Sequence, residues 1–200
     1  RTGLKVEAAL LEGQEMSGLS LDFQKAFDRI PQQHIFELAK IAGLPEHLVN
    51  CLSAAYAKLQ RHFRIGPFIG EGFSSTNGIL QGCPLSIILL NLLMHVWAEG
   101  VAAECPGCNP QCYADDASTT CTERPGALQR VLDFTSEFSH LAGMALNIKK
   151  SLAWATSEAG RAQLKALRLE GRQPPIASHE RLLGAQMIYN CASVAHCDVA

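Results

Sequence analysis

The stretch CYADDAS, residues 112–118, sets two carboxylates side by side, Asp115 and Asp116, directly behind a tyrosine. The residues around the pair read as two short strands, at residues 111–114 and 117–121. Asp tolerates the backbone conformations of tight turns, so we expect the pair at the tip of a β-hairpin. An Asp-Asp pair is most often a solvated turn, and its surroundings decide whether it is more.

Adjacent negative charges are tolerable where a divalent cation binds them, because hard cations take carboxylate oxygens as ligands. Such a site would draw a third carboxylate from a neighbouring strand. Asp22, in SLDFQKAFD, lies at the end of a predicted strand at residues 17–23. Neighbouring strands lie about 5 Å apart, so Asp22 can reach the hairpin. Two metal ions on these three carboxylates would stabilise the attacking and leaving oxygens of a phosphoryl transfer.

The composition is that of a soluble globular domain: 200 residues, 48% hydrophobic and 18% charged. The net charge of −2 argues against a long basic nucleic-acid surface and leaves a local groove open. Eight Cys residues without an apolar signal segment at the start of the sequence indicate a reducing compartment, so we expect an intracellular protein with free thiols.

Hydrophobic periodicity predicts an α+β fold with an antiparallel sheet flanked by helices. Helices are expected at residues 31–43, 45–59, 84–103, 125–143 and 158–169. Strands are expected at residues 17–23, 111–114, 117–121, 145–148, 151–155 and 182–187, with a strand pair within 61–75. Polar residues and Pro84 interrupt the apolar run at 79–96, which predicts a buried helix and no membrane span.

Five segments together resemble motifs A to E of reverse transcriptases, in that order. They are SLDFQKAFDRIP (20–31), NGILQGCPLSIILLNLLM (77–94), CYADD (112–116), LAGMALNIKKS (141–151) and RLLGAQM (181–187). The segments are most similar to non-LTR retrotransposon enzymes, with group II intron reverse transcriptases as near relatives. The resemblance implies a polymerase palm at residues 17–188 with incomplete fingers and thumb. Residues 1–16 would be a remnant of the fingers-palm connection, and residues 189–200 an unassigned tail.

The resemblance assigns the catalytic roles. Asp22 and Asp115 match the metal-binding aspartates, and Asp116 matches the second carboxylate of the same box, so the expected cofactor is Mg²⁺, or Mn²⁺ in its place. Lys150 matches a lysine proposed to protonate the departing pyrophosphate, as a positioned lysine can. Lys149 is the competing assignment.

The resemblance also assigns contacts with the incoming nucleotide. Phe27 matches the aromatic ring that excludes a 2′-hydroxyl and selects deoxynucleotides, although its pattern alone suits a core aromatic. Gln81 and Gly82 match a pair that contacts nucleotide and template, since Gly permits close backbone approach and an amide can bond to a base or sugar edge. Without the family, Gly82 would be a helix entry.

The remaining matches concern the nucleic acid. Tyr113 would support the primer end, and Leu183 and Gly184 match the primer-grip region. The implied partners are an RNA template, a DNA primer and deoxynucleoside triphosphates, with no membrane, and a nuclear location if the protein acts in retrotransposition.

Other residues carry weaker signals. Asp28 matches a recurring residue of the family, but its position just before Pro31 also suits a helix cap, which we expect. The C-x-x-C spacing of CPGCNPQC raises a zinc site at Cys105, Cys108 and Cys112, with Cys121 as a fourth ligand across the hairpin, but we expect free thiols there. Three histidines on helices are expected at surface or packing positions: His34, His47 and His140.

The sequence therefore favours an RNA-directed DNA polymerase domain. A non-catalytic reverse-transcriptase-like relic, or a scaffold for RNA or protein, is the alternative, and the intact carboxylates argue against it. An RNA-dependent RNA polymerase is a third interpretation, disfavoured by Phe27.

Overall fold

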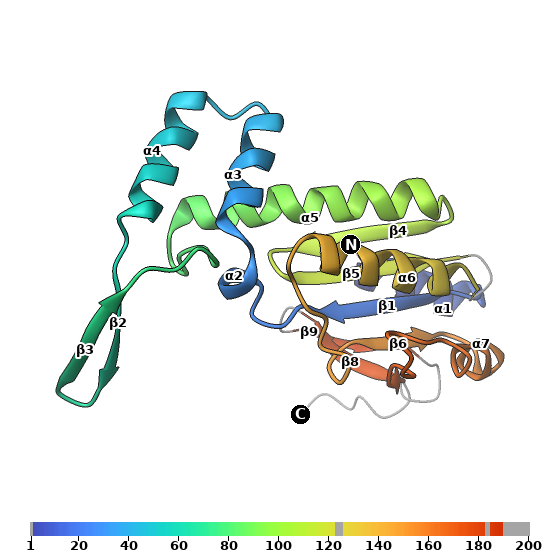
Figure 1. The fold of residues 1–200 in the computed structure, drawn as a ribbon. Coiled ribbons are helices and arrows are strands. Elements are labelled where there is room, and N and C mark those ends of the chain that lie inside the picture. The colour runs from blue at the N-terminus through green and yellow to red at the C-terminus, as the bar shows by residue number, and fades with distance from the viewer. Residues whose placement is uncertain (1, 123–125, 183–184, 190–200) are drawn as a thin grey trace.

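The computed structural model describes residues 2–122, 126–182 and 185–189 (Figure 1). The helices are α1 (Thr2–Glu12), α2 (Ala26–Arg29), α3 (Gln32–Ile41), α4 (Glu46–Ala57), α5 (Pro84–Glu104), α6 (Gly126–Leu141) and α7 (Glu158–Leu164). The strands are β1 (Ser17–Asp22), β2 (Arg61–Ile65), β3 (Phe68–Phe73), β4 (Cys108–Tyr113), β5 (Asp116–Cys121), β6 (Leu152–Ala155), β7 (Ile176–Ala177), β8 (His179–Leu182) and β9 (Ala185–Ile188).

The central sheet has the strand order β4-β5-β1-β6-β7, so β1 lies in the middle. All its neighbours pair antiparallel except β6 and β7, which are parallel. The α+β fold with an antiparallel sheet flanked by helices is therefore confirmed, with one parallel edge pair that the sequence did not predict. Because β1 is central, it is paired with β5 on one edge and with β6 on the other, and both pairings help to hold the residues at its C-terminal end in place.

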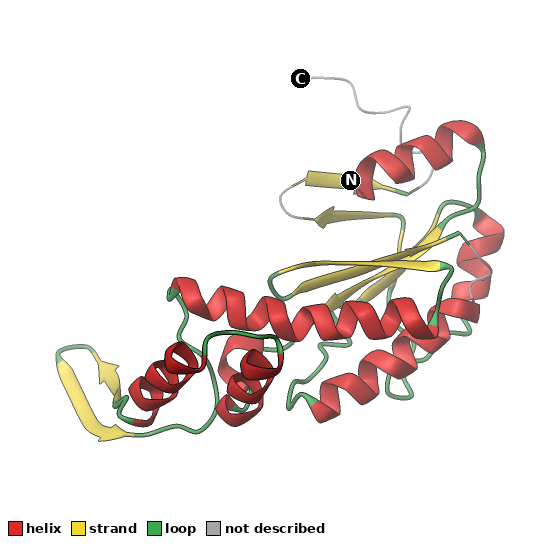
Figure 2. Cartoon of the chain, turned by 90° about the horizontal axis from the view of Figure 1, so that it is seen from above, coloured by secondary structure: helices red, strands yellow, loops and turns green. Residues whose placement is uncertain are grey.

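Helices cover both faces of the sheet: α5 and α6 lie on one side and α1 on the other (Figure 2). Alternation along β1 sends Leu19 and Leu21 into the main core, which also holds Leu90 and Trp97 of α5. A smaller cluster on the opposite face joins Val6, Ala9, Met16, Trp154 and Tyr189. The Trp154 and Tyr189 rings stack with centroids 4.3 Å apart.

Helix α5 begins with Pro84, as expected from the preference of proline for the first helical turn. Seven of its residues are buried, among them Trp97, whose indole N–H donates to Thr135 Oγ1 of α6. Within the described residues it is the one helix long and apolar enough, by length and composition, to cross a membrane. Its contacts with β4, α3 and α6 give the apolar face the role expected of a core helix.

Strands β2 and β3 form a separate hairpin that projects from the helical end of the molecule (Figures 1 and 2). Every residue of β3 is exposed, and the Phe63 and Phe73 rings stack with centroids 5.0 Å apart. The expected strand pair within residues 61–75 is therefore present.

Several sequence expectations are wrong in detail. In place of one strand at residues 182–187, β8 ends at Leu182 and β9 begins at Ala185. Asp116 is the first residue of β5, since its Cα pairs with both Tyr113 and Asp22, and is not a turn residue. Residues 145–148 form no strand beyond an isolated bridge between Phe23 and Leu146, because a turn at residues 148–150 follows. Helix α7 ends at Leu164 instead of continuing to residue 169.

Candidate active site

The three aspartates meet at one end of the central sheet. Asp22 ends β1, Asp116 begins β5, and the two are direct cross-strand partners. Asp115 belongs to the two-residue turn that joins β4 to β5, next to Ala114. Ala114 has a φ of 53°, the positive value that the first central residue of a type II′ hairpin turn requires. This tight turn delivers Asp115 and Asp116 to the end of β1.

The hydrogen-bonding pattern of β1 brings Asp22 and Asp116 especially close. The Asp22 N–H donates to Ser151 Oγ, 3.1 Å away, and the Asp22 carbonyl accepts from the Asn147 N–H, 2.8 Å away. Both backbone groups of Asp22 therefore point away from β5, which makes Asp22 and Asp116 a non-hydrogen-bonded pair. Opposed residues of such pairs have Cα atoms about 4.5 Å apart, and their side chains project to the same face.

That face is the one opposite α5 and α6. Side chains alternate along a strand, so Asp22 shares its face with Gly18, whose α-carbon lies against the Trp154 ring of the smaller cluster. Leu19 and Leu21 point the other way into the main core. The carboxylates are therefore presented outside the core and are free to meet a ligand.

Mutual repulsion is visible in the electrostatics of the three carboxylates. Partial desolvation, and then the negative charges of Asp115 and Asp22, raise the pKa of Asp116 above its ordinary value of 3.8. In the described part of the chain, no Lys or Arg forms an ion pair with any of the three. A bound cation would relieve this repulsion.

The donor set fits a hard divalent cation, because it consists of carboxylate oxygens from two adjacent strands. Over the described residues, no three His, Cys, Asp or Glu side chains already lie close enough together to hold a metal ion. Mg²⁺ commonly takes only one or two carboxylates and completes its coordination with water and substrate phosphates. One or two of Asp22, Asp115 and Asp116 would therefore be enough for an open site that substrate completes.

The segments of Phe27 and Gln81 lie together. The Ile79 N–H donates to the Phe27 carbonyl at 2.6 Å, and Gln81 Nε2 donates to Asp28 Oδ1 at 3.3 Å. Gly78 permits this approach: its φ is +83°, and a Cβ there would lie 2.9 Å from the Asp28 carbonyl oxygen. The half-buried Phe27 ring packs against the main core, so both its core and its substrate-facing interpretations remain compatible with its position.

Asp28 does not cap the following helix, contrary to the sequence expectation. Asp28 lies within α2, and Pro31 is the N-cap residue of α3. The carboxylate instead holds the amide of Gln81.

Gly82 and Tyr113 are both open to solvent. Gly82 has a φ of +86°, and a Cβ on it would meet no atom within 4 Å, so nothing in the described chain occupies the space beside it. Tyr113 ends β4 with its side chain 68% exposed, and its backbone pairs with Asp116. The predicted primer-grip residues, Leu183 and Gly184, lie outside the described residues.

Lys149 and Lys150 are exposed in the turn that precedes β6. The Lys150 N–H donates to the Asn147 carbonyl at 3.0 Å, and Asn147 in turn donates to the Asp22 carbonyl. The backbone of this turn is thereby fastened to the backbone of Asp22.

The cysteines show no sign of a metal centre within the described residues. The Cys105 thiol donates to the Ala127 carbonyl, and the Cys112 thiol donates to the Met94 carbonyl. Partial desolvation raises the pKa of Cys112 to about 11. The six cysteines of the described residues are free thiols. The three histidines, His34, His47 and His140, are exposed.

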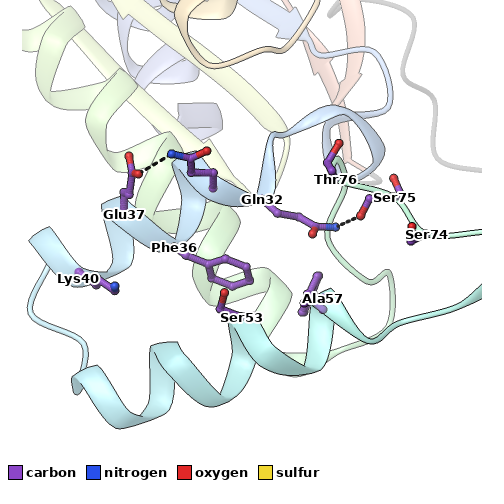
Figure 3. A pocket seen from close by; sticks show the side chains of 11 residues that line it. Gln32, Phe36, Glu37, Lys40, Ser53, Ala57, Ser74, Ser75 and Thr76 are labelled. Atoms are coloured by element: carbon purple, nitrogen blue, oxygen red, sulfur yellow. Dashed lines mark hydrogen bonds between the residues drawn. The ribbon is translucent and has the colours of Figure 1, made fainter.

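Three supporting residues were not identified from the sequence: Ser151, Gly78 and Gln32. Gln32 Nε2 donates to the carbonyls of Ser75 and Gly78, each at 3.0 Å, and so fixes the loop that leads to Gln81. Gln32 also lines a cavity of about 470 Å³ between α3, α4 and residues 74–76, which contains none of the predicted catalytic residues (Figure 3). A glycine, a serine and a glutamine carry no periodic signal, so only tertiary contacts reveal these roles.

Asp116→Asn is expected to raise the melting temperature of the metal-free chain at neutral pH, because it removes a carboxylate that is desolvated and repelled by Asp115 and Asp22. The pKa of Asp116 is raised on folding, so the native state binds more protons and stability falls as the pH rises through that pKa. The gain should therefore shrink in acid, where Asp116 is protonated. Thermal melts across pH test this, with the exposed Asp133→Asn of α6 as control. A lower melting temperature for Asp116→Asn at neutral pH would contradict it.

The sequence matches a known protein family over most of its length. The family model described as Reverse transcriptase (RNA-dependent DNA polymerase) matches residues 2–174. A Pol polyprotein of retrotransposable element R2DM of Drosophila melanogaster is 30% identical over 137 residues, which are 66% of this chain and 13% of that protein. The corresponding R2 polyprotein of Popillia japonica is 24% identical over 173 residues, 82% of this chain and 27% of that protein. The chain thus spans a minor part of these relatives.

Solved structures agree on the fold. Apo telomerase from Candida tropicalis, truncated from its C-terminal domain, superposes with a TM-score of 0.64 at 16% identity, over 94% of this chain and 37% of that one. Telomerase from Candida albicans gives 0.60 at 12% identity, over 94% and 32%. At these identities the likeness shows the polymerase palm fold alone. With the match over residues 2–174 and the R2 relatives, the chain belongs to the reverse transcriptase family, as a retrotransposon reverse transcriptase domain of the non-LTR type.

Proposed function

We propose that this domain catalyses RNA-directed DNA synthesis by transferring deoxynucleotides to a primer end with two divalent metal ions. The observation that carries the proposal is the register of β1 and β5, which sets Asp22 directly opposite Asp116 with Asp115 in the adjoining turn. Carboxylates gathered without a paired Lys or Arg among the described residues have an evident use as cation ligands.

The roles divide between the two sides of the site. Asp22, Asp115 and Asp116 would hold the metal, Mg²⁺ or Mn²⁺, which when bound stabilises the attacking and leaving oxygens of the transfer. Lys150 would protonate the departing pyrophosphate, and its attachment beside Asp22 supports that role.

Phe27, Gln81 and Gly82 would receive the nucleotide. The contacts between residues 27–28 and 79–81 hold the segments of Phe27 and Gln81 together, which supports a shared role for them. The positive φ and open surroundings of Gly82 leave room for a ligand to approach the backbone.

An RNA template and a DNA primer are the proposed macromolecular partners. Two observations support them: the family's description as an RNA-dependent DNA polymerase, and the exposed Tyr113 beside the carboxylates. An aromatic ring at the end of β4 is suited to contact with a primer terminus.

Phe27→Ala is expected to raise incorporation of ribonucleotides relative to deoxynucleotides by about tenfold or more, because a close-packed ring excludes a 2′-hydroxyl by volume. The assay uses a chimera in which this chain replaces its counterpart in an R2 polyprotein. Single-nucleotide extension of a DNA primer on an RNA template then gives kcat/KM for each sugar.

The matched control is Phe134→Ala, which truncates another half-buried phenylalanine, on α6, away from the carboxylates. It should leave the sugar ratio unchanged. An unchanged ratio in an active Phe27→Ala enzyme would make Phe27 a core aromatic and reopen the RNA polymerase interpretation. A wild-type chimera without metal-dependent extension would favour the non-catalytic relic.

A further inference from the structure

We propose that Ser151 is a positioning residue for Asp22, and that its hydroxyl sets the affinity of the carboxylate site for divalent cations. This inference rests on the proposed function of Asp22 as a metal ligand. It concerns how the fold holds that aspartate, and it assigns a task to a serine that touches no substrate.

Ser151 completes a closed set of hydrogen bonds around the backbone of Asp22. The Asp22 N–H donates to Ser151 Oγ at 3.1 Å, and the Ser151 N–H donates to the Asn147 carbonyl at 2.8 Å. The Asn147 N–H then donates to the Asp22 carbonyl at 2.8 Å. Both backbone groups of Asp22 are thus held by one five-residue segment.

This set stands where the sheet itself stops. The last pair of the β1–β6 ladder is Ser20 with Leu152, so Asp22 has no strand partner on that side. The Ser151 hydroxyl oxygen takes the place of the carbonyl that a longer β6 would have supplied. Ser151 is 0% exposed, so water does not readily replace its hydroxyl as the acceptor.

The position of Asp22 on this side decides its spacing from Asp116 on the other. The backbone groups of Asp22 are committed to residues 147–151, and no ladder hydrogen bond to Asp116 fixes the distance between the two. Loss of the hydrogen bond from the Asp22 N–H to Ser151 Oγ would increase the mobility of the end of β1, where the carboxylates have to come together to bind a cation. Partners that only orient a metal ligand typically change affinity by about 10–100-fold.

The test compares the full chain with Ser151→Ala, using Mg²⁺ and Mn²⁺ as the probes. Two quantities are measured: the cation concentration that gives half of the maximal rise in melting temperature, and the hydrogen-exchange rate of the Asp22 amide without metal. Ser151→Ala should raise the first by about tenfold and the second by roughly tenfold.

Two further variants make the result specific. Ser139→Ala removes another buried hydroxyl, one that donates to the Thr135 carbonyl within α6, and should change neither quantity. Ser151→Cys keeps the side-chain shape with a weaker acceptor, so it should shift both quantities in the same direction and less far. It also serves if Ser151→Ala does not fold.

The outcomes separate this inference from the function on which it rests. A wild-type chain without any cation response would overturn the metal-binding proposal itself. A wild-type response that Ser151→Ala and Ser151→Cys leave unchanged would overturn the positioning role alone. A weakened response in Ser151→Ala equal to that in Ser139→Ala would also overturn it, as a general effect of losing a buried hydroxyl.

Discussion

Gly18→Ala is expected to destabilise the domain by about 3 kcal/mol, at the upper end of ordinary overpacking, and to lower its melting temperature by about 6–12 °C. Gly18 lies in the central strand β1, opposite Trp154 of β6. A Cβ there would collide with the Trp154 indole ring and lie 2.5 Å from the Thr119 carbonyl oxygen. The Thr119 oxygen belongs to the backbone of β5, so a whole strand, and not only a side chain, would have to move.

Thermal and denaturant unfolding measure this effect, with Gly126→Ala as the matched control. A Cβ on Gly126, at the start of α6, meets no atom within 4 Å, so that variant should be neutral or slightly stabilising. Because the Thr119 carbonyl also blocks the Cβ, a smaller side chain at Trp154 should not restore full stability to Gly18→Ala. A Gly18→Ala protein as stable as Gly126→Ala would show that the ring packing at Gly18 is misplaced.

Local signals in the sequence were enough for β1, for the β4–β5 hairpin and for the residues that bear the carboxylates. Strand β1 and the β4–β5 hairpin follow from short apolar alternation around a turn that Asp can occupy, and these patterns need no knowledge of the rest of the chain. The helix stop at Gly43 was equally readable, since its φ of 84° is a value that glycine adopts easily.

The register between β1 and β5 could not be predicted from the sequence. A shift of one residue along β5 would set another side chain opposite Asp22, and the turn at Ala114 fixes only the register of β4 with β5, not that of β5 with β1. The sequence therefore placed both Asp115 and Asp116 at the hairpin tip, whereas the second is a strand residue.

The segment 145–151 shows why supporting contacts were missed. Its first residues alternate like a strand, but Gln24 and Asp22 each form separate hydrogen bonds with its backbone, and a turn occupies residues 148–150. Ser151 gains its position from a contact with a residue 129 positions earlier in the chain. A single long-range hydrogen bond leaves no periodic pattern in the sequence. The hydrogen bonds of Asn147 and Ser151 with the backbone of Asp22 can therefore be seen only in the structure.

Asp22→Asn is expected to weaken Mg²⁺ binding by at least about 100-fold, because loss of a ligand carboxylate exceeds the 10–100-fold effect of losing a partner that only orients one. The amide keeps the size of the side chain and removes its charge. Asp22 lies at the end of β1 with its backbone held by Ser151 and Asn147, so the substitution should leave the fold in place. Asp115→Asn should have a similar effect, since that residue adjoins Asp116 in the turn.

Titration of the folded chain with Mg²⁺ and Mn²⁺, followed by melting temperature, tests the shared carboxylate site most directly, because a ligand that binds only the native state stabilises it. The wild-type chain should show a saturable rise that Asp22→Asn and Asp115→Asn abolish and the exposed control Asp133→Asn retains. An equal rise in all four proteins would place the cation elsewhere and contradict a metal site formed by Asp22, Asp115 and Asp116.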